Sequence, residues 1–291
     1  MSLRDGFSYF QAKPARWLLA AALAISSALG GEPLSVAPQS HQDDQPTPEA
    51  KTAGREHAPA RHDAEWKAAP RPAPTNPKEL PPAFAKATPS SIADLRSIEQ
   101  RVKELVRRVT PAVVDVEIGG GTGSGVIISE DGLVLTAGHV CGESGRAVRM
   151  TFSDGRKARG KTIGASRDSD CGLIRITDRG PWPHVAVGDL EQTRPGDWVL
   201  ALGHPGGFDL RRSLVVRLGR IIRLEDGNLQ TDCTISQGDS GGPLLDMFGR
   251  VIGIHSSISS SLTANFHVPI TDFYQNWDQM VKTLNTPPKQ D

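Results

Sequence analysis

Twelve short β-rich segments, separated by turn signals, dominate the chain from residue 112 to residue 268. Val, Ile, Leu and Thr recur in these segments, and Gly, Asp or Pro stands between them. Many short strands with frequent turns predict an all-β sandwich or barrel and exclude alternating β and α units. The predicted strands are 112–118, 125–129, 133–137, 147–151, 157–165, 171–176, 198–202, 214–224, 229–231, 243–245, 251–256 and 264–268.

Two predicted helices flank the strands. The first begins at Ser90 or Ser91, carries apolar residues at steps of three and four, and ends at Thr110-Pro111. The second covers about 271–284. The strands divide near 188–195 into two comparable sets. We therefore predict one folded domain over 91–285, followed by a short tail over 286–291.

The first ninety residues have a different character. Residues 1–30 combine a basic start, an apolar run and small residues at the end, which predicts a secretory signal peptide cleaved after Gly30. The apolar stretch 17–29 is shorter than the ~20 residues of a membrane span, so cleavage is favoured over the alternative, a membrane anchor. Residues 31–90 are rich in Pro and Ala, which predicts a disordered tether. We therefore expect an exported protein, periplasmic or secreted.

Charge and histidine placement exclude several classes of ligand. The chain has 33 basic and 33 acidic residues, so its overall charge indicates neither nucleic acid nor an anionic membrane as a partner. His41, His57 and His62 lie in the predicted tether without a cysteine or a tight ligand spacing. We expect no nucleic-acid partner, no metal and no cofactor, and contact with a membrane only if the N-terminal segment stays uncleaved.

The segment from Gln237 to Pro243, which reads QGDSGGP, surrounds a serine with glycines. A serine hydroxyl is a poor nucleophile at neutral pH and needs a base, an exposed position and donors for an oxyanion. Gly238 allows a sharp turn, so the N–H groups of Gly238 and Ser240 are candidate oxyanion donors, with that of Asp239 as a third. A simple surface turn is the alternative reading.

A candidate base and a candidate acid precede this serine in the chain. His139 follows a predicted strand and has small neighbours, so its ring can lean into a cleft. A general base of this kind needs a carboxylate that fixes its tautomer. Asp170 stands at the head of the strand 171–176, and Asp168, two residues earlier, is its local competitor.

The order His139, Asp170, Ser240, with GDSGGP at the serine and TAGHV at the histidine, resembles the trypsin-like serine proteases and most closely the bacterial HtrA (DegP-like) branch. The resemblance covers roughly 91–285 and includes further stretches: 110–114, 123–128, 201–205, 231–232, 251–254 and 268–269. It implies two packed antiparallel β-barrels of the chymotrypsin-like kind, with Asp170 as the triad acid. It also implies a serine endopeptidase that forms an acyl-enzyme on Ser240 and acts on exported or misfolded polypeptides in protein quality control.

The chain departs from that branch at several points. HtrA-type proteases usually carry a PDZ domain after the protease, and we expect none here because the sequence ends at Asp291. The branch usually has Asn before the serine, where this chain has Asp239. In trypsin-like zymogens this acid pairs with a new N-terminus, but no such activation sequence occurs, so the sequence leaves the partner of Asp239 open. The oligomeric state is also open, with a trimer implied by the resemblance.

Four residues are predicted to contact substrate. By the resemblance, Thr234 lies at the floor of the main specificity pocket, where a non-acidic residue favours a small or medium apolar side chain over Arg or Lys. Ser256 and Ser257 are expected to pair with the substrate as an added strand. His267 either lines the substrate groove or faces solvent.

Two alternative functions and one covalent feature stay open. The first alternative is a catalytically inactive peptide-binding protein on a protease scaffold. The second is a carboxylester hydrolase, because Gly238-x-Ser240-x-Gly242 fits a nucleophile elbow, but the order of the three residues argues against it. Cys141 and Cys171 neighbour the triad residues and either form a disulfide or remain buried free thiols, which is the more ordinary outcome.

Overall fold

The computed structural model describes residues 79–212, 214–225, 227–258 and 264–282, all of which lie in one compact unit, Asp63–Asp291. The predicted signal peptide, the predicted tether as far as residue 78 and the predicted tail lie outside the described residues. No helix within the described ranges has both the length and the apolar character needed to cross a membrane. The alternative anchor over 17–29 is likewise outside them.

The last part of the predicted tether contains a short helix that the sequence analysis does not predict. Pro82–Ala85 form a 3-10 helix, η1, in which Ala83 is buried. The prolines of the tether were expected to exclude helix, but proline is tolerated in a first helical turn, where its missing N–H needs no partner. Lys86, which follows η1, forms a 2.8 Å ion pair with Asp94 of the next helix.

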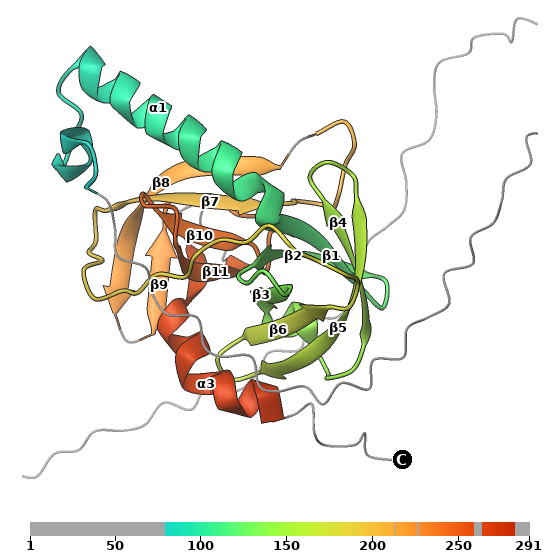
Figure 1. The fold of residues 1–291 in the computed structure, drawn as a ribbon. Helices are drawn as coiled ribbons and strands as arrows, with labels where there is room; N and C mark the ends of the chain where they lie inside the picture. Colours follow the sequence, from blue (N-terminus) through green and yellow to red (C-terminus); the bar gives the residue numbers. More distant parts are fainter. Residues whose placement is uncertain (1–78, 213, 226, 259–263, 283–291) are drawn as a thin grey trace, which may run out of the picture. The chain divides into compact units, whose positions relative to one another are not determined.

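Helix α1, Ile92–Val109, begins and ends where the sequence predicts (Figure 1). The hydroxyl of Ser91 accepts a 3.1 Å hydrogen bond from the N–H of Asp94, a cap that contributes about 1 kcal/mol. Leu105 and Val109 are buried in the core. The first apolar residue of the predicted stripe, Ile92, is exposed, so only the later turns of α1 pack on the barrels.

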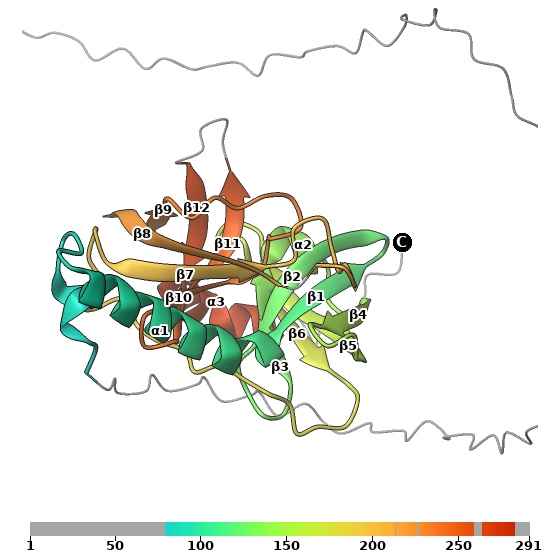
Figure 2. The same cartoon turned by 90° about the horizontal axis from the view of Figure 1, so that it is seen from above.

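The first six strands close into one antiparallel barrel, in the order β1-β2-β3-β6-β5-β4 (Figures 1 and 2). Each strand pairs with its neighbours in an antiparallel register, such as Val126 opposite Leu135. Because the sheet is closed, it leaves no unpaired edge. The strands are β1 Val113–Ile118, β2 Gly121–Ile127, β3 Leu133–Ala137, β4 Ala147–Phe152, β5 Lys157–Ser166 and β6 Cys171–Ile176.

The last six strands close into a second antiparallel barrel, in the order β10-β11-β12-β9-β8-β7. The sequence analysis places the division between the barrels at 188–195, and the connection between β6 and β7 includes these residues. The predicted fold of two antiparallel barrels is therefore confirmed. The strands are β7 Trp198–Gly203, β8 Val215–Glu225, β9 Asn228–Thr231, β10 Pro243–Asp246, β11 Val251–Ile258 and β12 Asn265–Pro269.

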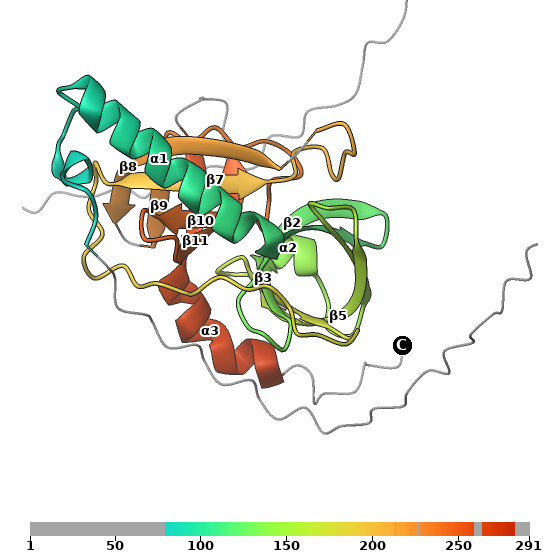
Figure 3. The ribbon, with the colours of Figure 1, turned by 45° about the horizontal axis from the view of Figure 1, so that its top comes forward.

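The C-terminal helix α3, Ile270–Lys282, joins the barrels. It packs on β5 and β6 of the first barrel and on β11 and β12 of the second (Figure 3). Phe273 and Met280 are fully buried on its inner face. The predicted apolar spacing of this helix therefore buries one stripe against both barrels at once.

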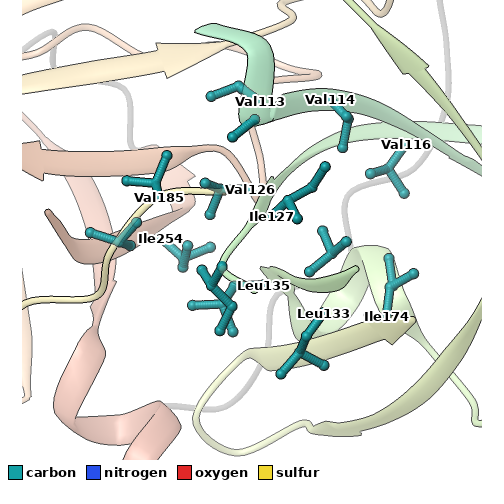
Figure 4. Close-up of a cluster of buried hydrophobic side chains, with 14 of the residues drawn as sticks. Val113, Val114, Val116, Val126, Ile127, Leu133, Leu135, Ile174, Val185 and Ile254 are labelled. Carbon is teal, nitrogen blue, oxygen red and sulfur yellow. The ribbon is translucent and has the colours of Figure 1, made fainter. Parts of the chain in front are cut away.

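One hydrophobic cluster reaches from the first barrel into the second. Val126 and Leu135 belong to the first barrel and Ile254 to the second, and all are at most 1% exposed. Figure 4 shows Val185, from the connection between the barrels, beside Val126 and Ile254. The barrels thus share a packed interface, and residues at their facing edges have fixed relative positions.

Two local differences from the prediction lie beside the interface between the barrels. Strand β2 begins at Gly121 instead of residue 125, because its glycine-rich start pairs with β1. A short helix, α2 Gly138–Cys141, follows β3 and carries His139, where the sequence analysis expects only the end of a strand. Strand β2 bonds to the loop that contains Ser240, through the N–H of Ser124, and α2 packs on strands of the first barrel.

Candidate active site

His139 and Asp170 are held together by backbone and side-chain bonds. The N–H of Gly138 donates to the carbonyl of Asp170 at 2.7 Å, which fixes the start of α2 against the residue that precedes β6. The N–H of His139 donates to Oδ1 of Asp170 at 2.8 Å. Ring atom Nδ1 of His139 lies 2.9 Å and 3.0 Å from the two carboxylate oxygens. A carboxylate accepts, so Nδ1 carries the proton and Nε2 is the basic nitrogen.

The structure pairs Asp170, and not Asp168, with the histidine. Asp170 has a positive φ of 51°, an uncommon conformation for a residue other than glycine that strains the backbone. That conformation places the carboxylate within reach of both His139 and Ser256. The side chain of Asp168 forms no hydrogen bond or ion pair with the other residues that the structure describes.

The two groups shift each other's titration. The hydrogen bond that His139 donates to Asp170 raises the pKa of His139 above its usual value, although burial opposes this effect. Burial acts to raise the pKa of Asp170, but the hydrogen bonds from His139 and Ser256 outweigh it and lower that pKa. The pair therefore favours an ionised carboxylate beside a histidine that readily accepts a proton.

Ser240 lies in the loop before β10, on the second barrel. Its carbonyl accepts a 2.7 Å hydrogen bond from the N–H of Ser124 on β2. The next residue, Gly241, packs against β3, since a Cβ added there would lie 3.1 Å from the nitrogen of Ala137, two residues before His139. The loop therefore brings Ser240 to the edge of the first barrel that carries His139.

Ser256 links the serine to the acid. The hydroxyl of Ser240 donates to the carbonyl of Ser256 at 3.3 Å, and the hydroxyl of Ser256 donates to Oδ2 of Asp170 at 2.6 Å. Among the described residues, the hydroxyl of Ser240 makes no hydrogen bond to His139. Bonds of this kind are often loose without a substrate, and a rotation of the Ser240 side chain is the movement that would form it.

Within the part of the chain that the structure describes, the backbone N–H groups of Gly238 and Ser240 have no acceptor and could bind an anion. Gly238 has a φ of 93°, and the N–H of Asp239 donates to the carbonyl of Ser236 at 2.9 Å, which closes a tight turn. The carbonyl of Gln237 accepts from the N–H of Gly206 at 2.8 Å. Because a trans peptide holds C=O and N–H on opposite sides, this bond directs the N–H of Gly238 away from Gly206.

The predicted oxyanion donors thus divide into two groups. Among the described residues, the N–H groups of Gly238 and Ser240 have no hydrogen-bond acceptor, so both can serve a ligand. The N–H of Asp239, the third predicted donor, instead donates to the carbonyl of Ser236 within the turn. Ser124 also holds this loop, because its hydroxyl donates to the carbonyl of Gly238 at 2.8 Å.

The predicted substrate contacts have mixed outcomes. Thr234 and Ser257 are exposed, and Ser256 is partly buried at the centre of the site. His267 is 3% exposed and lies between Thr231, at 2.8 Å from Nε2, and the Nδ1 atom of His255, at 2.9 Å. The alternative in which His267 faces solvent is therefore wrong.

A pocket of about 350 Å³ lies on the Asp170 side of the site. Its wall includes Asp168, Asp170, Ser256, Ser257 and His267, but not Thr234. This pocket is continuous with the exposed end of β11, where the sequence analysis expects the substrate to pair. Three of the four predicted contact residues, Ser256, Ser257 and His267, therefore line the same pocket.

The three cysteines are buried free thiols. A disulfide between Cys141 and Cys171 is therefore absent from the structure, and the sulfur of Cys141 instead points at two backbone carbonyls, 3.4 Å away in each case. Within the described residues, no group of three or more His, Cys, Asp or Glu side chains has an arrangement suited to a metal ion. His41, His57 and His62 lie outside the described residues.

Sequence reasoning missed two residues that shape the site. Gly206 holds the peptide between Gln237 and Gly238 from a loop more than thirty residues earlier in the chain. Arg217 on β8 pairs with the buried carboxylate of Asp239. The only sequence signal for Arg217 is its charge inside the apolar run Leu214–Leu218.

Comparison with known proteins agrees with this geometry. The family model described as "Trypsin-like peptidase domain" matches residues 123–254. A probable periplasmic serine endoprotease of the DegP-like kind from Pseudomonas fulva is 34% identical over 192 residues, which are 62% of this chain and 40% of the relative. A putative protease Do-like 14 from Arabidopsis thaliana is 34% identical and is covered to 44% of its length.

Solved structures give the same result. The serine endoprotease from Yersinia pestis has a TM-score of 0.54 and 28% identity, over 62% of this chain and 66% of that one. The HtrA-type protease AlgW with tripeptide has the same TM-score and identity, over 62% and 63%. The chain spans about two fifths of the length of the curated relatives described above.

Two closed six-stranded barrels with His139, Asp170 and Ser240 at their junction define a protein of the chymotrypsin-like class. Within that class, the sequence relatives reported above are named DegP-like and Do-like, and one of the solved structures is named an HtrA-type protease. The chain contains a trypsin-like peptidase domain whose homologues are the HtrA/DegP-like serine proteases.

Proposed function

We propose that this protein is a serine endopeptidase with Ser240 as nucleophile, His139 as general base and Asp170 as the acid that orients the histidine. One observation carries the proposal: the carboxylate of Asp170 holds the proton on Nδ1 of His139 and leaves Nε2 as the basic nitrogen, while the N–H of Ser124 binds the loop of Ser240 to the same barrel. A histidine that a carboxylate orients, near a serine in a glycine-rich loop, is the arrangement from which a hydroxyl is activated.

The reaction would follow from these positions. The hydroxyl of Ser240 turns from the carbonyl of Ser256 to Nε2 of His139, gives up its proton and attacks the carbonyl carbon of a peptide bond. The free N–H groups of Gly238 and Ser240 stabilise the oxyanion. His139 then donates the proton to the leaving amine, and water, activated by the same histidine, hydrolyses the acyl-enzyme.

Polypeptides are the proposed substrates. Ser257 and the end of β11 are exposed beside the nucleophile, so an extended peptide can add to this strand by backbone hydrogen bonds with little demand on its sequence. The relative AlgW was solved with a tripeptide, and other relatives are named periplasmic. We therefore propose an exported enzyme that acts on exported or misfolded proteins, with a small or medium apolar residue preferred before the cleaved bond.

Labelling with a fluorophosphonate probe, together with cleavage of an unfolded protein, tests this function. We expect the purified chain to react with the probe and to cleave, and Ser240→Ala to do neither while it keeps the melting temperature of the parent. Ser97→Ala, a serine on α1 away from the site, is the matched control and should keep both activities. Absence of labelling in the folded parent chain would contradict the proposal.

A catalytically inactive peptide-binding protein is the second candidate. The observation that favours it is the hydrogen bond of the Ser240 hydroxyl to Ser256 instead of His139. The same experiment separates the two functions, because an inactive scaffold would bind an extended peptide without any reaction of Ser240 with the probe.

A further inference from the structure

Asp239 stands between the two free N–H groups, and its side chain points away from them into the second barrel. The carboxylate is 0% exposed. It accepts hydrogen bonds from both terminal nitrogens of Arg217, at 2.9 Å and 2.8 Å. It also accepts from the N–H of Ser236 at 2.8 Å and from the Ser236 hydroxyl at 3.3 Å. Arg217 is thus the partner that the sequence left open.

Arg217 reaches this carboxylate from a different strand. It lies on β8, directly opposite Ala201 of β7, and its side chain is 18% exposed. Among the ion pairs of the described residues, it is the one cation that meets Asp239. The planar fork of a guanidinium matches the two oxygens of a carboxylate, so the pair fixes orientation as well as charge.

The carboxylate controls the shape of the oxyanion loop. Three hydrogen bonds join Ser236 and Asp239: the N–H of Asp239 donates to the carbonyl of Ser236, and the N–H and the hydroxyl of Ser236 donate to the carboxylate of Asp239. These bonds close the turn in which Gly238 adopts its φ of 93°. If the carboxylate left its place, the turn would keep only the first of them, and the N–H groups of Gly238 and Ser240 would lose their common direction.

The carboxylate can remain in place only while it is paired. An ionised carboxylate without a partner in a buried site is strongly unfavourable, and removal of one member of a buried ion pair commonly costs about 3–5 kcal/mol. Without Arg217, the side chain of Asp239 would have to reach solvent or take up a proton. The first response would pull directly on the residues on either side of it.

We propose that Arg217 is a positioning residue for catalysis: its ion pair with Asp239 holds the loop Ser236–Ser240 in the form that directs the N–H groups of Gly238 and Ser240 into the site. The proposal rests on the protease function proposed above. Arg217 touches neither substrate nor reacting atoms and acts through Asp239. The oxyanion hole is therefore assembled by a residue within the folded domain.

Steady-state kinetics of Arg217→Met on a peptide substrate is the first test. We expect kcat to fall by about 10²–10³, the effect of losing an oxyanion donor, with KM changed by less than about threefold. Arg217→Lys keeps the positive charge but lacks the planar fork of the guanidinium, so its kcat should lie between those of the parent and Arg217→Met. Arg223→Met, an exposed arginine on the same strand, is the matched control and should retain the parent kcat.

Two experiments that restore kcat distinguish a positioning role of Arg217 from a simple loss of stability. Millimolar guanidinium ion should restore part of the kcat of Arg217→Ala in a saturable way, because it can refill the site beside Asp239. In the double variant Arg217→Met/Asp239→Asn, no charge is left buried and the amide can still accept from Ser236, so kcat should recover at least tenfold over Arg217→Met. If Arg217→Met does not fold, Arg217→Lys and the double variant carry the comparison.

The outcomes separate this proposal from the protease function. A folded parent chain that neither labels nor cleaves would overturn the function itself. An active parent with a folded Arg217→Met of unchanged kcat would overturn the positioning role alone. A loss of kcat that neither guanidinium ion nor Asp239→Asn reverses would also count against that role, since it would indicate damage beyond the loop.

Discussion

The hydroxyl of Ser256 donates a 2.6 Å hydrogen bond to Oδ2 of Asp170, and this bond joins β11 of the second barrel to the acid of the first. It is shorter than either distance from Asp170 to the ring of His139. The carboxylate is therefore oriented from two sides, by the ring of His139 and by the hydroxyl of Ser256.

Loss of this hydroxyl should slow the reaction without abolishing it. A hydrogen bond to a charged group contributes about 1.5–3 kcal/mol, so we expect Ser256→Ala to lower kcat/KM by about ten- to a hundredfold. Ser256→Thr keeps the hydroxyl and should stay within a few-fold of the parent. Equal activity of the alanine and threonine variants would show that the bond has no role in the reaction.

Replacement of the acid should have a larger effect. In Asp170→Asn the amide cannot stabilise the imidazolium, and kcat should fall by about 10⁴. Asp168→Asn provides the matched control, because Asp168 lies two residues away in the same pocket wall without a bond to His139. A comparable loss in both variants would mean that the pocket's charge, and not the pairing with His139, supports activity.

The pH dependence of the rate should report the state of His139. Its pKa is raised above 6.5, chiefly by the hydrogen bond to Asp170. A protonated ring cannot accept the proton of Ser240, so kcat/KM should fall as pH decreases, with a midpoint above 6.5. In the residual activity of Asp170→Asn this midpoint should move to lower pH. An unmoved midpoint would assign the titration to another group.

Buried histidines should make the fold sensitive to acid. Burial lowers the pKa of His204 to about 4 and that of His255 to about 3, and it lowers the pKa of His267 as well. The unfolded chain binds these protons near pH 6.5, so the free energy of unfolding should decrease below that pH, by up to about 1.4 kcal/mol per pH unit for each histidine.

Denaturant unfolding between pH 7 and pH 4.5 measures this sensitivity. His204→Gln removes one of the buried rings and should flatten the dependence of the free energy of unfolding on pH. His184→Gln, at an exposed position, should leave it unchanged. Parallel curves for the parent and His204→Gln would contradict the assignment.

The thiols should be unreactive in the folded chain. Burial raises the pKa of Cys141 to about 12 and that of Cys233 to about 11, and it raises the pKa of Cys171 strongly as well. Because the thiolate is the reactive form, a thiol reagent should label none of them at neutral pH and all three after denaturation. A reducing agent should leave the melting temperature unchanged, and a decrease would indicate a disulfide.

Local patterns were sufficient for most of the fold. Each of the twelve predicted strands overlaps a strand of the structure. Strands could be predicted because both of their signals, β-forming residues and the turn residues that bound them, lie close together in the sequence. The predicted division near 188–195 also holds. The helix α2 was missed, since four residues carry too little periodicity to reveal it.

The candidate site divides in the same way. Glycines mark the loop at Ser240, and the structure brings His139 and Asp170 together as the resemblance implies. The pair Arg217–Asp239 could not be foreseen, because it depends on how β8 aligns with β7 and on which face of β8 the arginine occupies. One residue of register shift would turn that side chain to the other face.

Ser124 binds the loop of the other barrel at two points, the carbonyls of Gly238 and Ser240. Gly238 and Ser240 are also the residues whose N–H groups would face the substrate. Any displacement of one barrel relative to the other must break these two hydrogen bonds before it exposes much of the shared core. Turnover should therefore depend closely on the relative position of the two barrels. During denaturation, activity should be lost at a lower denaturant concentration than most of the secondary structure.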